Sequence, residues 1–106
     1  MRKTYLFLAR RSNPMNGVRV LLKILPPFAK NGIIERYYTL PGTPRIVDVL
    51  RLAQNEGILD MSKVVDEKGE VREGVVVLVN GRTVYETECE LNGESRVVIL
   101  PLVTGG

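Results

Sequence analysis

Histidine is absent from this sequence of 106 residues, and there is a single cysteine, Cys89. Imidazole is the usual general base near neutral pH and the commonest metal ligand, so catalytic triads and dyads that depend on histidine are excluded. One cysteine can form neither an internal disulfide nor a cysteine-ligated zinc site within the chain. We therefore expect a protein of a reducing, cytoplasmic setting, whose chemistry would use carboxylates, lysines, hydroxyls, one thiol or the chain ends.

Long hydrophobic runs are also missing. No stretch approaches the ~20 apolar residues that span a bilayer, so we do not expect a membrane protein. Residues 5–9 are apolar, but a secretory signal core needs ~7 to 15 apolar residues, and here Arg10 and Arg11 follow at once. With 44% hydrophobic and 25% charged residues, the composition is that of a globular chain, and the length is that of about one domain.

Acidic residues are absent from residues 1–34, which carry seven basic residues, whereas residues 35–106 carry eight basic and twelve acidic ones. A basic first third could bind nucleic acid or another anionic partner. Nucleic-acid binders usually combine arginines with stacking aromatics, so we do not expect nucleic acid as a partner. A cluster of Ser, Asn, Pro and Gly at residues 12–17 separates a basic N-terminal extension, residues 1–16, from a domain formed by residues 17–106.

The first part of this domain is predicted to be a hairpin followed by a helix. Alternating apolar residues predict a strand over residues 18–25, and β-branched and aromatic residues predict another over residues 33–40. From Ile46 onward, apolar residues recur at three- and four-residue spacing, which is typical of a helix with one buried stripe. We expect Thr43 to cap this helix, Pro44 to occupy its first position and Gly57 to end it.

The second part is predicted to contain more strands. Residues 75–79 are all apolar, and Asn80-Gly81 behind them is a strong hairpin signal, so a return strand should begin at Thr83. Residues 97–100 predict a last strand, and its wholly apolar character indicates a central position in the sheet.

Acidic residues gather between these two parts. A metal site built from Asp66, Glu67 and Glu70 is conceivable, but the EF-hand spacing of acids and glycine is absent. A solvated turn explains the same residues, and we expect no metal site.

The order of elements predicts an α+β domain of the β-grasp type, a mixed sheet with one main helix crossing one face. One helix covers only one side of a sheet. If Val75, Val77 and Val79, or Val98 and Leu100, face away from it, they leave an apolar patch that could bind a partner. The alternative is burial on both sides or self-association.

The sequence ends in an extended arm, Pro101-Leu102-Val103-Thr104-Gly105-Gly106. Because glycine has no Cβ, such an arm can thread a narrow channel and present the α-carboxylate of Gly106 to another protein's active site. A terminal carboxylate is ionised at neutral pH and can attack an ATP phosphate to give an acyl-adenylate. The catalytic groups would then belong to the partner.

At these residues the chain resembles the ubiquitin-like sulfur carriers, especially the small subunit of molybdopterin synthase. The family's usual ending is Val, two apolar residues, an aromatic or apolar residue, Pro, Pro, Val, Ser or Thr, Gly, Gly, and residues 97–106 are similar to it with Leu102 in place of the second proline. Residues 77–82, Val-Leu-Val-Asn-Gly-Arg, are similar to the family's preceding strand and turn. The turn at residues 93–97 is one residue longer than the family's Gly-Asp-Glu-Val.

The resemblance implies a ubiquitin-like carrier with no bound cofactor, and not an enzyme. A ubiquitin-activating-type enzyme would use ATP to adenylate Gly106, and sulfide delivered from a persulfide would displace AMP. The resulting thiocarboxylate would donate sulfur within molybdopterin synthase, together with its large subunit, or to another sulfur-acceptor enzyme. Gly105 would pass through the partner's channel, and the other partner-binding residues would be Thr104, Val103, Leu102, Leu100 and Val98.

Two other functions remain open. The same adenylate could serve a ubiquitin-like modifier whose Gly106 becomes joined to lysines, and a sulfur carrier could instead supply thiamine synthesis or tRNA thiolation. A β-grasp module that binds RNA through its basic first third, without using the tail, is the remaining alternative.

Overall fold

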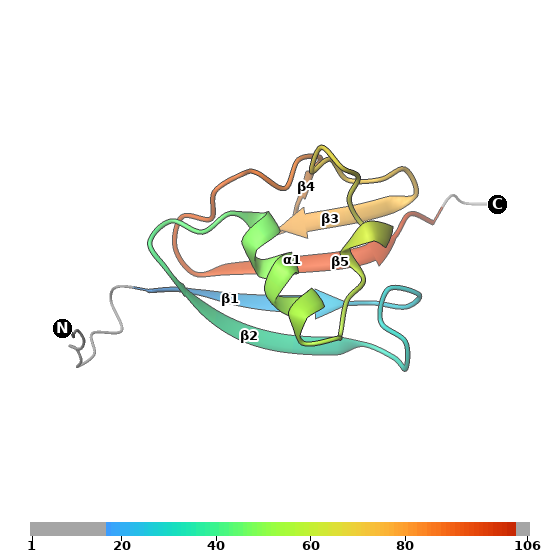
Figure 1. Ribbon diagram of the computed structural model, residues 1–106, viewed down its shortest axis with the longest axis horizontal. Helices are drawn as coiled ribbons and strands as arrows, with labels where there is room; N and C mark the ends of the chain where they lie inside the picture. The colour runs from blue at the N-terminus through green and yellow to red at the C-terminus, as the bar shows by residue number, and fades with distance from the viewer. Residues whose placement is uncertain (1–16, 104–106) are drawn as a thin grey trace.

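The computed structural model describes residues 17–103, which form one five-stranded sheet with a helix across one face (Figure 1). Along the chain the elements are β1 (Gly17–Ile24), β2 (Ile34–Pro41), α1 (Ile46–Asn55), the short 3-10 helix η2 (Met61–Lys63), β3 (Val75–Val79), β4 (Arg82–Val84) and β5 (Ser95–Pro101). Their order across the sheet is β2-β1-β5-β3-β4. The predicted α+β architecture is confirmed, including the central place of the last strand. No helix within residues 17–103 is long and apolar enough to cross a membrane.

The sheet is mixed because β5 lies parallel to β1 and antiparallel to β3. β1 and β2 form the predicted antiparallel hairpin, with Val20 opposite Tyr38. The β3–β4 hairpin also forms as predicted. Asn80 and Gly81 have φ values of 52° and 86°, the left-handed pair that a two-residue turn between twisted strands requires.

The start of the helix differs from the prediction. α1 begins at Ile46, and Thr43 and Pro44 precede it. The first helical amides are satisfied from elsewhere, since the N–H groups of Ile46 and Val47 donate to carbonyl oxygens of the loop at residues 87–89, at 3.0 and 2.8 Å. A side-chain cap at Thr43 is therefore not needed.

The end of the helix matches the prediction. Gly57 adopts φ 79°, its N–H donates to the carbonyl of Gln54, and the N–H of Ile58 donates to the carbonyl of Ala53. This pair of hydrogen bonds is the Schellman motif, which closes a helix when a glycine follows it in the left-handed conformation.

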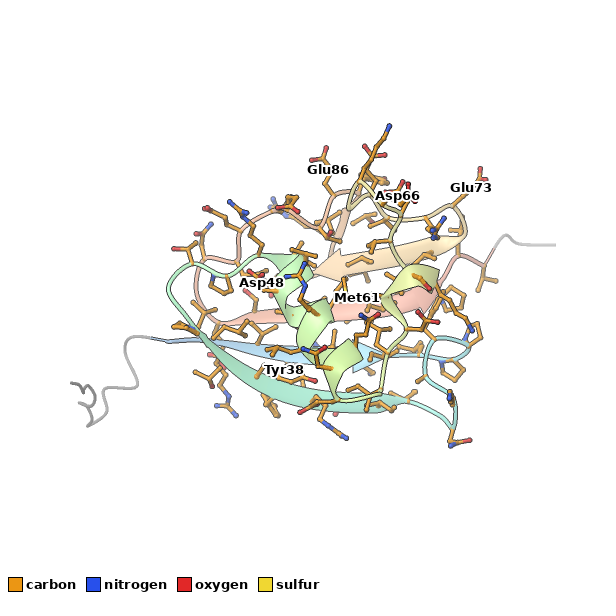
Figure 2. All side chains as sticks on the ribbon, in the orientation of Figure 1. Tyr38, Asp48, Met61, Asp66, Glu73 and Glu86 are labelled. Carbon is orange, nitrogen blue, oxygen red and sulfur yellow. The ribbon has the colours of Figure 1, made fainter. Side chains whose placement is uncertain are left out.

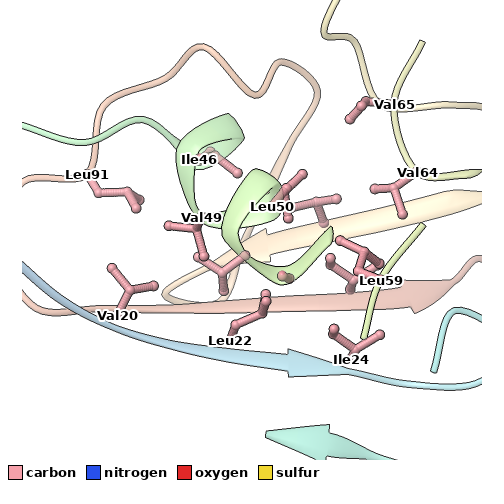
Figure 3. Close-up of a cluster of buried hydrophobic side chains, with 14 of the residues drawn as sticks. Val20, Leu22, Ile24, Ile46, Val49, Leu50, Leu59, Val64, Val65 and Leu91 are labelled. Carbon is pink, nitrogen blue, oxygen red and sulfur yellow. The ribbon is translucent and has the colours of Figure 1, made fainter. Parts of the chain in front are cut away.

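The core lies between α1 and one face of the sheet (Figure 3). Val20, Leu22 and Ile24 from β1 pack there with Val49 and Leu50 from α1, and all five are fully buried. Residues from η2's neighbourhood and the loop before β5 complete the cluster, namely Leu59, Val64, Val65 and Leu91. Because burial of such side chains contributes ~25 cal/mol per Å² of apolar surface, this face fixes the position of α1 on the sheet.

Candidate functional site

The face of the sheet away from α1 carries an apolar patch. Along each strand, side chains alternate between the two faces, and those that belong to the core are Val20 and Leu22 on β1, Val77 on β3, and Val97 and Ile99 on β5. Their neighbours therefore point to the opposite side. We call this set the open-face patch; it consists of Leu21, Val76, Leu78, Val98 and Leu100, all half-buried.

The register places the members of the patch side by side. Val98 lies opposite Leu78 across the β3–β5 pairing, and Leu100 lies opposite Val76. Leu21 lies on β1, the other neighbour of β5. The open-face patch is therefore one continuous surface centred on β5, of the kind that soluble domains usually reserve for a partner.

Basic side chains border the patch toward β2. The guanidinium carbon of Arg19 lies 4.4 Å from the centre of the Tyr37 ring, and Lys23 Nζ lies 3.9 Å from a carboxylate oxygen of Glu35. Arg96 on β5 faces the same side, next to Leu21 in the register. The rim of the open-face patch on this side is therefore cationic and aromatic.

The chain leaves the sheet directly beside the patch. Pro101 is the last residue of β5 and pairs with Val75, and the N–H of Leu102 donates to the carbonyl of Gly74 at 2.9 Å. After this bond the side chains turn to solvent, since Leu102 is 55% and Val103 is 81% exposed. Apolar surface thus continues from the patch into the arm.

The predicted partner-binding residues divide into three groups. Val98 and Leu100 lie together on the open face, and Leu102 and Val103 are exposed where the chain leaves β5. The predictions for Thr104, Gly105 and Gly106 concern residues outside the part of the chain that the structure describes.

Sequence reasoning also named residues that do not join the patch and missed some that do. Val77 is fully buried, and Val75 and Val79 pack against the core, so these three residues face α1. Of the two alternatives, Val98 and Leu100 are the ones that point away. Leu21, Val76 and Leu78 were not singled out, although alternation with the apolar positions of 18–25 signals the place of Leu21.

The acid-rich turn at residues 66–70 is held by hydrogen bonds within the turn. Asp66 Oδ1 accepts the N–H groups of Lys68 and Glu70 at 2.8 and 3.0 Å, and these bonds, chiefly that from Glu70, lower the pKa of Asp66. Within residues 17–103, no three Asp, Glu or Cys side chains are grouped so as to hold a metal ion. Figure 2 shows Asp66, Glu73 and Glu86 along the loop side of β3 and β4.

The architecture, a mixed five-stranded sheet gripping one helix, is the ubiquitin-like β-grasp fold. The chain is similar to the solution structure of the HVO 2177 protein from Haloferax volcanii, with a TM-score of 0.64 and 23% identity over 86% of this chain and 89% of that chain. It is also similar to the crystal structure of SAMP1 from Haloferax volcanii, with a TM-score of 0.58 and 22% identity over 83% of this chain and 99% of that chain. No protein-family model and no curated protein matches the sequence.

Proposed function

We propose that this protein is a ubiquitin-like sulfur carrier whose reactive group is the α-carboxylate of Gly106. The observation that carries the proposal is the continuity of the open-face patch with the exposed Leu102 and Val103, which lead directly to Thr104-Gly105-Gly106. A carrier needs a surface that docks on an enzyme and a narrow arm that reaches the active site. The open-face patch supplies the first, and residues 102–106 supply the second.

The chemistry runs through the partner. The carboxylate of Gly106 attacks the α-phosphorus of ATP, an acyl-phosphate bond forms, and pyrophosphate leaves. A sulfide donor then attacks the acyl carbon, AMP leaves with the electrons of the broken C–O bond, and a thiocarboxylate results. Activation is required because a carboxylate is a poor electrophile. The chain's own contribution is binding and positioning, so we propose a carrier and not a catalyst.

We propose that an ATP-dependent activating enzyme docks on the open-face patch and then on Leu102 and Val103. Half-buried aliphatic side chains surrounded by polar residues have the composition of an interface core. The same patch would dock on the acceptor enzyme after sulfur loading, since both partners must receive the same arm.

For the destination of the sulfur we propose the synthesis of molybdopterin, with the large subunit of molybdopterin synthase as acceptor. The support is the similarity of residues 97–106 to the ending of that enzyme's small subunit. Copurification of the protein with such a large subunit is the expected result, and copurification with an enzyme of thiamine synthesis or tRNA thiolation would redirect the proposal within the carrier class.

The proposal is tested by activation of the purified chain. We expect ATP–pyrophosphate exchange with the activating enzyme of the same organism, and its loss on deletion of Gly105 and Gly106. Substitution of Gly106→Ala should reduce exchange strongly, because a Cβ obstructs a channel shaped for glycine. Normal exchange by the deletion variant would reject Gly106 as the reactive group.

Mass spectrometry then separates carrier from modifier. The intact mass of the mature protein establishes that Gly106 carries a free carboxylate, and sulfur loading should add the mass difference between one sulfur and one oxygen. If the adenylate instead passes to lysines, higher-mass conjugates joined through Gly106 would replace this product. That outcome would support the modifier function in place of sulfur transfer.

A further inference from the structure

A second surface, separate from the open-face patch, lies at the outer edge of β2. This strand is at one end of the sheet order, and no strand of residues 17–103 pairs with its outer side. It is eight residues long, whereas β4 at the opposite end has three. Long free edges are templates for another strand, and proteins commonly shorten or cover them.

The hydrogen-bond pattern identifies the free groups on this edge. The N–H of Leu25 donates to Ile99 on β5, so by alternation Ile24 and every second residue before it bond to β2. Ile34, its partner, therefore points inward, as does every second residue after it. The backbone N–H and C=O groups of Glu35, Tyr37 and Thr39 consequently point outward, away from β1.

A cavity of about 400 Å³ opens beside the beginning of this strand. Its apolar lining includes Phe28 from the β1–β2 loop, Ile34 from β2 and Ile58 after α1. Phe28, Ile34 and Ile58 are half-buried against the core, so the cavity has an apolar wall that is open to solvent.

Farther along β2, a polar cluster closes the space toward α1. Tyr38 Oη donates to Glu56 at 2.7 Å, and the Nε of Arg36 lies 3.7 Å from the same carboxylate (Figure 2). Burial, and then the bond to Glu56, raise the pKa of Tyr38 above its ordinary value, so the phenol remains a donor. The cavity is thus the place along β2 where an added side chain can enter.

The mouth of the cavity is positively charged. Lys30 and Lys63 line it, and neither forms an ion pair with another residue of the described range. Asp60 lines it too, but its Oδ1 already accepts from the N–H and hydroxyl of Ser62, at 3.1 and 2.6 Å. Two cations thus face one carboxylate that is already hydrogen-bonded.

We propose that the edge of β2 binds an extended segment of a partner protein, in which an apolar side chain fills the cavity and acidic residues flank it. Backbone pairing with Glu35, Tyr37 and Thr39 supplies affinity independent of sequence, and the cavity and the two lysines supply the preference for apolar and acidic residues. Residues 1–16 of this chain carry four basic residues and no acidic one, so their charge does not suit this site. The site does not use Gly106 and is independent of the proposed carrier function.

The direct test is titration of the isotopically labelled full chain with a synthetic peptide of three valine or isoleucine residues between pairs of aspartates. We expect the largest amide shifts at Glu35, Tyr37 and Thr39 and around the cavity. A matched peptide with lysines in place of the aspartates should bind about tenfold more weakly or less. Absence of binding at ~1 mM aspartate peptide would overturn the proposal, as would shifts confined to the open-face patch.

Two pairs of variants separate the charge from the edge. The double variant Lys30→Glu and Lys63→Glu should weaken the aspartate peptide about tenfold, whereas Lys68→Glu, in the turn of residues 66–70, should change binding less than about twofold. Thr39→Pro removes one outward N–H, which an edge strand tolerates, and should weaken binding about tenfold relative to Thr39→Val. Equal binding by Thr39→Pro and Thr39→Val, or a β2-dependent dimer that competes with the peptide, would reject strand addition by a partner.

Discussion

On the face of the sheet that α1 covers, Val77 and Ile99 are fully buried; on the opposite face their strand neighbours Leu78 and Val98 keep part of their surface in water. The residue types are the same, and they lie on the same two strands. What differs is the layer above them. The covered face gains stability from burial, whereas the open face keeps apolar area available for binding. One strand, β5, thereby serves folding with alternate residues and recognition with the rest.

The largest expected effect comes from truncating the covered side of β5. Ile99→Ala removes a fully buried side chain and should lower the free energy of unfolding by about 2–5 kcal/mol, because the cavity left beneath α1 cannot collapse completely. Denaturant unfolding followed by circular dichroism measures the loss. A loss below about 1 kcal/mol would mean that β5 does not anchor the core as its burial indicates.

The next residue of the strand should behave in the opposite way. Leu100→Ala truncates a half-buried member of the open-face patch, so the loss of stability should be smaller than for Ile99→Ala, while kcat/KM for adenylation should fall about tenfold. Thr83→Ala, at the far edge of the sheet, is the matched control and should leave adenylation unchanged. Normal activation of Leu100→Ala would remove the open-face patch from the activating interface.

The sequence predicts most of this architecture because its strands and turns carry local signals. Asn80-Gly81 occupies the left-handed conformations that its residue types favour, and Gly57 ends α1 with the expected hydrogen bonds. The start of α1 was misjudged because its first amides bond to carbonyls of residues 87–89, about forty positions away in the sequence. Long-range partners of this kind have no local signature at Thr43 or Pro44.

The two faces of the sheet were harder to assign. Residues 75–79 and 97–100 are apolar throughout, so alternation cannot tell which members face the helix. The register with β1, whose polar Arg19 and Lys23 mark the open side, resolves the assignment in the structure. The cavity beside β2 was not predicted, since it combines the β1–β2 loop with the segment after α1.

A third prediction concerns the helix that separates the two faces. Gly57→Ala should cost about 1 kcal/mol, because Gly57 adopts φ 79° and an alanine is strained there, although an added Cβ meets no atom within 4 Å. Asn55→Ala, at the last residue of α1, is the control and should be neutral or slightly stabilising. Thermal unfolding of the two variants measures the difference, and equal stability would mean that the glycine conformation does not limit the end of the helix.

The smallest effect should come from the acidic loop side, remote from both faces of the sheet. The backbone hydrogen bonds to Asp66 lower its pKa in the folded state, so its ionised form stabilises the fold above the unfolded-state pKa, and this contribution is lost as the pH falls through the folded-state pKa. Asp66→Asn should therefore have a slightly lower Tm than the unsubstituted protein at neutral pH. The difference should vanish in acid below the folded-state pKa. Glu67→Gln, whose side chain makes no hydrogen bond among residues 17–103, should show no such pH-dependent difference, and a gap for Asp66→Asn that persists in acid would assign the effect to shape instead of charge.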